Sequence, residues 1–155
     1  MNPTRILPDL QCSLMCEDIR QEATGNFILL GVLNAIVLPQ VPVTAGRLVF
    51  FNRWTAGYGR FKETLRLMAP DQITVLGKRE INFELPNPSG HAINVPVLTN
   101  ITFNAPGVYF VEVLVDDVMK IRYPLNVALV PKPQPPGPET PPAGPANPTP
   151  PAGAA

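Results

Sequence analysis

Short apolar segments separated by proline, glycine, asparagine and aspartate recur along residues 10–130, and they constrain the fold more than any other feature. The alternation of apolar and polar residues is clearest over residues 80–85. A period of two puts neighbouring side chains on opposite faces of a strand, so that one face is packed and the other is wet. Turn signals such as Pro70-Asp71-Gln72 and Asn104-Ala105-Pro106-Gly107 close the segments. The pattern predicts a series of strands joined by short loops.

About eight strands are expected, with few residues between them. They fall at 10–18, 26–38, 47–54, 61–69, 73–85 with a bend at Gly77-Lys78, 93–103, 108–115 and 119–130. This number of strands in about 120 residues predicts an all-β fold, an antiparallel two-sheet β-sandwich of the immunoglobulin-like or C2-like kind. A closed barrel is the alternative, and residues 17–22 also permit a short helical turn.

Two of the later segments carry more detail. The segment 108–115 is apolar except for Glu112, which indicates a central strand, and Asp116-Asp117 then predicts a tight hairpin. Pro124 has no N–H to donate, so the last strand is expected to lie at an edge or to contain a bulge there.

Composition changes at Pro131. Residues 131–155 hold more than half of the chain's 21 prolines and no large apolar residue, which predicts a disordered, extended tail. The expected organisation is an N-terminal arm (1–9), a β-sandwich domain (10–130) and this tail. Pro133-Gln134-Pro135-Pro136 fits a PxxP ligand for a proline-recognising domain, but a spacer is the interpretation that such a composition favours.

The charge balance argues against two classes of partner. Twelve Lys and Arg match twelve Asp and Glu, and only 15% of residues are charged. Without a cluster of cations we expect binding neither to nucleic acid nor to a membrane surface. The longest apolar run, 27–38, is shorter than the roughly 20 residues of a spanning helix, and Met1 to Pro8 lacks the apolar core of a signal peptide. The sequence thus predicts a cytoplasmic protein.

Residues for catalysis or for metal binding are scarce. The single histidine, His91, lies in a predicted loop and is expected at the surface or at a strand start. Cys12 and Cys16 would lie about 13 Å apart in one strand at ~3.3 Å per residue, too far for a disulfide, and are expected to be buried thiols. Glu17-Asp18 and Asp116-Asp117 each supply too few oxygens for calcium unless the two pairs meet. We therefore expect no enzyme, no cofactor, no catalytic residue and no metal site.

One cluster has the composition of a binding surface. Arg53, Trp54, Tyr58 and Arg60 surround the loop Ala56-Gly57-Tyr58-Gly59. Trp, Tyr and Arg dominate the energetics of protein interfaces, and an exposed Trp also stacks on sugar rings. The alternative, which we favour, is that Trp54 fills the core while the two arginines solubilise the strand edges.

The motifs also resemble those of a family of uncharacterised bacterial proteins, a domain of unknown function for which a β-sandwich is expected. The matching segments are Leu10-Gln11-Cys12, Cys16-Glu17-Asp18-Ile19-Arg20, Gly25-Asn26-Phe27, Leu30-Gly31-Val32, Phe50-Phe51-Asn52-Arg53-Trp54, Pro106-Gly107-Val108-Tyr109 and Arg122-Tyr123-Pro124-Leu125. The resemblance covers nearly all of residues 10–130 and implies the fold and a bacterial source, but no site residues. We expect a non-enzymatic module for protein–protein interaction or a structural role; the alternative is the binding of a small ligand, carbohydrate or calcium.

Overall fold

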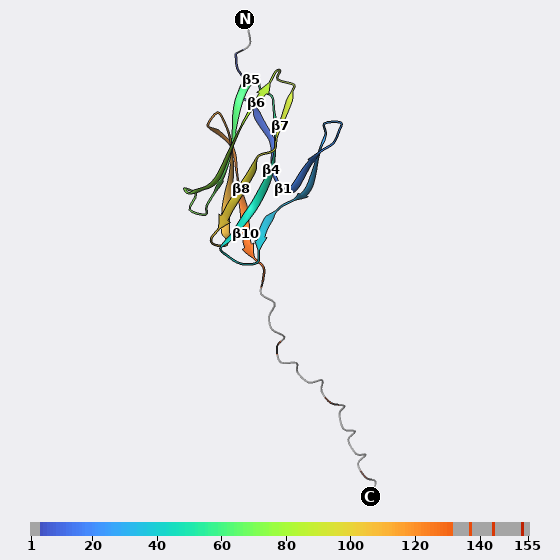
Figure 1. The fold of residues 1–155 in the computed structure, drawn as a ribbon, viewed down its shortest axis with the longest axis vertical. Coiled ribbons are helices and arrows are strands. Elements are labelled where there is room, and N and C mark those ends of the chain that lie inside the picture. Colours follow the sequence, from blue (N-terminus) through green and yellow to red (C-terminus); the bar gives the residue numbers. More distant parts are fainter. Residues whose placement is uncertain (1–3, 132–136, 138–143, 145–152, 154–155) are drawn as a thin grey trace.

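The computed structural model describes residues 4–131 together with Gly137, Gly144 and Gly153, and the chain forms two facing β-sheets (Figure 1). The strands of residues 4–131 are β1 (Asp9–Gln21), β2 (Phe27–Val32), β3 (Ala35–Leu38), β4 (Val43–Thr55), β5 (Gly59–Met68), β6 (Val75–Leu85), β7 (His91–Asn94), β8 (Val97–Phe103), β9 (Gly107–Val115) and β10 (Val118–Leu129). The predicted all-β, two-sheet fold is confirmed, with ten strands where about eight were expected.

The first sheet has the order β2-β1-β4-β7, and β8 also pairs with β4. The second sheet has the order β3-β10-β9-β5-β6, and one of the two sheets is curled into a half-barrel. All pairs are antiparallel except β3 with β10, which is parallel. The hydroxyls of Ser13 on β1 and Tyr123 on β10 lie 3.0 Å apart and join the two sheets.

The expected strand 26–38 is divided into β2 and β3, which belong to different sheets. Between them the chain leaves β1 and pairs with the end of β10 instead. The expected strand 93–103 is interrupted at Val95-Pro96, because proline cannot donate to the ladder. Residues 17–21 continue β1 as an extended strand and not as a helical turn.

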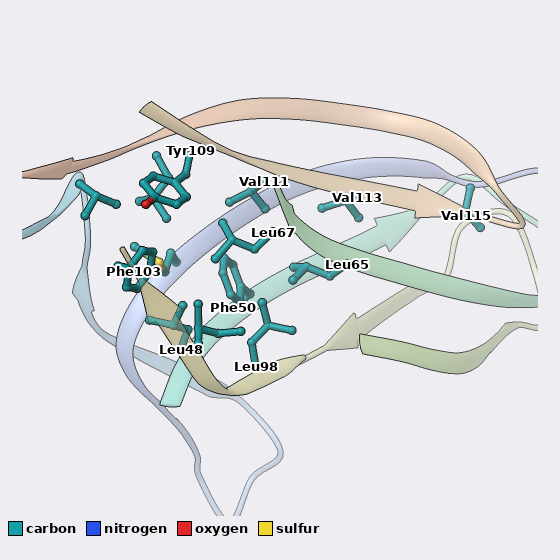
Figure 2. Close-up of a cluster of buried hydrophobic side chains, with 14 of the residues drawn as sticks. Leu48, Phe50, Leu65, Leu67, Leu98, Phe103, Tyr109, Val111, Val113 and Val115 are labelled. Atoms are coloured by element: carbon teal, nitrogen blue, oxygen red, sulfur yellow. The ribbon is translucent and has the colours of Figure 1, made fainter. Parts of the chain in front are cut away.

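The core lies between the inward faces of the two sheets. Figure 2 shows β4 and β8 contributing Leu48, Phe50, Leu98 and Phe103 against side chains of β5 and β9. The members of this cluster labelled there from β5 and β9 are Leu65, Leu67, Tyr109, Val111, Val113 and Val115. The period-two pattern of the sequence predicts these alternating inward positions.

The central strand β9 carries a buried charge on its outward face. Glu112 is 3% exposed and accepts a hydrogen bond from Arg66 Nε at 2.5 Å, with Arg122 Nε at 3.4 Å on the other side. Two cations on neighbouring strands balance the desolvated carboxylate, which explains a charge in a central strand. Pro124 lies where β10 pairs with β9 alone, because β3 pairs only with Asn126–Leu129, so the strand is locally an edge as expected.

No helix in the described part of the chain is long and apolar enough to cross a membrane. The prediction of a disordered tail and of a PxxP ligand concerns residues 131–155, of which nearly all lie outside the described residues, and it stays a prediction.

Candidate functional site

The structure separates the four residues of the predicted binding cluster. Arg53 and Trp54 are neighbours on β4, so their side chains point to opposite faces of the first sheet. Trp54 is fully buried, and its ring stacks on that of Phe83 at 5.5 Å between centroids. The proposal of an exposed Trp54 is therefore wrong, and the interpretation of Trp54 as a core residue is confirmed. Tyr58 lies in the loop before β5 and is half-buried, and Arg60, the second residue of β5, is exposed.

The indole N–H of Trp54 has a buried carboxyl as its hydrogen-bond acceptor. Trp54 Nε1 donates a hydrogen bond of 2.6 Å to Oε1 of Glu63 on β5, and Glu63 is fully buried. A buried indole N–H needs an acceptor, so Glu63 positions Trp54. Sequence reasoning missed Glu63, although its alternation with Phe61, Leu65 and Leu67 places it on the inward face of β5.

Two amides share the interior with this carboxyl. Burial raises the pKa of Glu63, and the nearby side chains of Trp54, Asn52 and Asn94 offset part of that rise. Oε2 of Glu63 and the amide nitrogens of Asn52 and Asn94 make no hydrogen bond of ordinary geometry with any described residue. The carboxyl is thus held in its protonated form to a higher pH than a free glutamate.

The N-terminal arm packs on the loop that precedes β5. Ile6 and Tyr58 exchange two backbone hydrogen bonds of 2.9 Å each. A Cβ added to Gly57 would lie 2.6 Å from Cβ of Pro8, and one added to Gly59 would lie 2.9 Å from Cγ of Arg5. The two glycines of this loop are therefore required by the close approach of the arm.

The guanidinium of Arg5 is held by three different groups. Nε and Nη2 donate to the carbonyl oxygen of Arg60 at 3.0 and 2.7 Å, and Nη2 also forms an ion pair with Asp116. Cζ lies 4.5 Å from the ring centroid of Phe61, a cation–π contact. Asp116 is fixed in turn, because its Oδ1 accepts a hydrogen bond of 2.9 Å from the backbone N–H of Lys62. Together these groups bind the guanidinium of Arg5.

An open depression of about 680 Å³ adjoins this arginine site. Its lining residues come from β5, β6 and the β9–β10 turn, namely Arg60, Phe61, Lys62, Asn82, Phe83, Glu84 and Asp116. Arg60, Phe61 and Asp116 belong to both, so the depression continues the arginine site. Figure 1 places the arm at the end of the molecule where β5, β6 and β7 lie.

A second surface is the outer edge of β2. This strand pairs with β1 and with no other strand of residues 4–131, and it contains no charged residue. Ile28, Leu30 and Val32 are 39%, 36% and 49% exposed, and their spacing puts them on one side of the strand. The blue hairpin formed by β2 and the end of β1 projects from the side of the sandwich in Figure 1.

The remaining candidate residues have structural places. His91 is exposed at the start of β7, as expected. Cys16 is buried and Cys12 is half-buried; both are free thiols, and burial raises the pKa of Cys16. No group of three or more potential ligands that could hold a metal ion occurs within the described residues.

The fold and these surfaces define a two-sheet β module with a free strand edge and an occupied arginine site. The sequence profile of a family of unknown function (DUF6941) matches residues 11–128. The chain belongs to this family, and the match covers the sandwich from β1 to the end of β10. Comparison with the curated proteins found no match.

Proposed function

We propose that this protein is a non-enzymatic interaction module, which binds a partner protein by adding a strand of the partner to the free edge of β2. The observation that carries the proposal is the uncharged β2 edge with Ile28, Leu30 and Val32 exposed on one side. An unpaired strand presents a row of backbone donors and acceptors, and extended segments bind such edges by main-chain hydrogen bonds.

The location of β2 supports this use. The hairpin leaves the sandwich body, so a docked strand meets the edge without displacing another element. Apolar side chains at alternate positions of β2 lie on one face, where they can contact the side chains of an added strand. Contacts with every second side chain of the added strand provide specificity.

The small-ligand alternative has less support. Trp54 is buried and so is not available to stack on a sugar. Both carboxylate oxygens of Asp116 already accept hydrogen bonds, from the Lys62 N–H and from Arg5, which argues against their use for calcium.

The test compares three baits made from the full chain: the wild type, Leu30→Lys and Val75→Lys. Val75 is a matched control, because it is 46% exposed on the edge strand β6 of the other sheet. A lysine on an edge strand opposes pairing. We expect a partner protein that binds the wild type and Val75→Lys but does not bind Leu30→Lys. The bound partner should also protect the amides of residues 27–32 from hydrogen exchange.

Partners that bind all three baits equally, or protection confined to other strands, would count against the proposal. Concentration-dependent dimerisation of the wild type that Leu30→Lys abolishes would identify the partner as a second copy of the chain. Circular dichroism of each variant shows whether the fold is kept.

A further inference from the structure

We propose that the groove beside β5 is a recognition site for an arginine in an extended segment of another protein, and that Arg5 of the N-terminal arm is its displaceable internal occupant. This site lies on a different strand from the β2 edge and does not depend on strand addition there.

The site is complete for a guanidinium. A carbonyl oxygen, a carboxylate and an aromatic face surround it, contributed by Arg60, Asp116 and Phe61. Bidentate and stacked contacts of this kind distinguish arginine from lysine. Asp116 is oriented before any ligand arrives, because it is bonded to the Lys62 N–H on the neighbouring strand.

Residues 4–8 of the arm are bound through few of their own side chains. Ile6 and Leu7 are 43% and 36% exposed, and the pairing of Ile6 with Tyr58 uses only backbone atoms. The contacts specific to sequence are those of Arg5 and of Pro8 on Gly57. Any extended segment with an arginine followed three residues later by a proline can make the same contacts.

The depression extends past the groups that hold Arg5. Lys62, Asn82, Phe83 and Glu84 line it and are not among the groups that bind the guanidinium, so a longer ligand can gain contacts there. Because the arm is tethered, it competes at an effective concentration of about millimolar. A partner segment therefore needs those additional contacts to replace it.

Charge favours a cationic ligand once the arm has left. The other charges that line the depression, Arg60, Lys62 and Glu84, include the ion pair of Arg60 with Glu84, whereas the ion pair of Asp116 among the described residues is with Arg5 alone. Removal of the arm therefore leaves the Asp116 carboxylate without a cation, which favours a cationic ligand over an acidic one.

The test uses a blocked peptide with the sequence of residues 4–8, Thr-Arg-Ile-Leu-Pro, titrated into the full chain by nuclear magnetic resonance. We expect binding to the Arg5→Ala variant about tenfold or more tighter than to the wild type, because the tethered arm keeps the backbone bonds of Ile6 but has lost the guanidinium with which it competes. Shifts are expected at Tyr58, Arg60 and Asp116. A peptide with lysine in place of arginine should bind about tenfold more weakly, since it cannot reproduce the forked hydrogen bonds.

Two further variants in the Arg5→Ala background separate recognition from folding. Asp116→Asn keeps the acceptor for the Lys62 N–H and suits the left-handed backbone at φ 45°, but removes the charge. It should weaken the peptide about tenfold or more, the scale of a hydrogen bond to a charged group. Asp117→Asn, in the same turn and 84% exposed, is the matched control and should leave binding unchanged.

Equal binding to wild type and Arg5→Ala, equal loss with Asp116→Asn and Asp117→Asn, or no binding to Arg5→Ala at millimolar peptide would overturn the proposal. A concentration-dependent dimer of the wild type that disappears in Arg5→Ala would show exchange of arms between copies, and would overturn the assignment to another protein.

Discussion

The two sheets end in edge strands of opposite character, β2 in the first sheet and β6 in the second. β6 carries Lys78, Arg79, Glu80 and Glu84, and its ion pairs include Lys78 with Glu80 at 2.8 Å. β2 has no charge and exposes three large apolar side chains. Charged edges prevent pairing with other chains. The difference indicates that β6 is protected against association and that β2 is available for it.

The packing of the interior next to β6 also differs from the packing next to β2. The ring of Phe83 on β6 stacks on Trp54 and lies tilted against Phe61, and Glu63 is bonded to the indole. β2 belongs to a hairpin that leaves the sandwich body, and its own apolar contacts include the edge-to-face pair of Phe27 with Phe51 at 6.1 Å. The β6 side should therefore determine stability, and the β2 side should determine binding.

The largest expected effect tests this division. Trp54→Ala should lower the free energy of unfolding by about 3–5 kcal/mol, because it empties a fully buried site. Leu30→Ala should lower it by about 1 kcal/mol or less, because the side chain is 36% exposed. Denaturant unfolding followed by circular dichroism measures both, since the first variant removes the only tryptophan. Trp54→Phe keeps an aromatic ring in the site and loses the hydrogen bond to Glu63, so the difference between the Ala and Phe variants measures the contribution of ring packing.

An equal loss for Leu30→Ala and Trp54→Ala would contradict the division, because it would make the hairpin part of the structural core.

The next effect concerns pH and Glu63. Its folded-state pKa is raised above the ordinary 4.5, so the folded chain binds this proton more tightly than the unfolded chain. The free energy of unfolding should therefore fall as the pH rises from about 4.5 through the folded-state pKa, by about 1.4 kcal/mol for each unit of the rise. Glu63→Gln keeps an acceptor for Trp54 and has no proton to lose. Its stability relative to the wild type should increase with pH over this window.

Thermal or denaturant unfolding from pH 4 to pH 8 measures the difference between the two proteins. A difference that stays constant across this range would show that Glu63 does not titrate differently in the two states.

Sequence reasoning went furthest where structure follows from local pattern. The alternation over residues 80–85 predicted a strand with one packed face, and the apolar run of 108–115 predicted a central strand. It failed where partners are distant in sequence. Nothing local indicates that β3 pairs in parallel with β10, since that choice depends on where the chain goes after it leaves β1.

The same reason limits prediction of the sites. The arginine site joins Arg5 to Asp116, 111 residues apart, and only the folded chain brings them together. Gly57 and Gly59 were the local signal, because two glycines in one loop indicate close approach of another backbone. Glu63 had a signal as well, a charged residue at an inward position of an alternating strand.

A smaller effect concerns the geometry of the β2 hairpin. Gly31 has φ 61°, and a Cβ there would lie 2.6 Å from the side chain of Glu17 on β1. Gly31→Ala should lower the free energy of unfolding by about 1–2 kcal/mol, the cost of a left-handed conformation for an L-residue. Gly46→Ala is the matched control, because a Cβ at Gly46 meets nothing within 4 Å. Its change should stay within about 0.5 kcal/mol, as for most surface positions.

Chemical denaturation gives both values, and hydrogen exchange of residues 27–32 shows whether the loss is confined to the hairpin. Equal changes in the free energy of unfolding for the two alanine variants would mean that the hairpin accepts a different backbone conformation at position 31 without loss of stability.

The smallest expected effect on stability, and the sharpest test of the comparison, is to give β6 the character of β2. Replacing Lys78 and Glu80 by valine removes two exposed ion pairs, Lys78 with Glu80 and Lys62 with Glu80, and leaves the net charge unchanged. The thermal midpoint should hardly move, because exposed ion pairs contribute little to stability. Sedimentation velocity at increasing concentration should instead reveal self-association that the wild type lacks at β6, since two of the four charged side chains of this edge have become apolar. The same positions changed to threonine keep β propensity and polarity, and they should leave the sedimentation of the wild type unchanged. If the valine variant also sediments as the wild type does, the charges of β6 do not prevent association at this edge. The absence of charge on β2 would then be no evidence that β2 binds a partner.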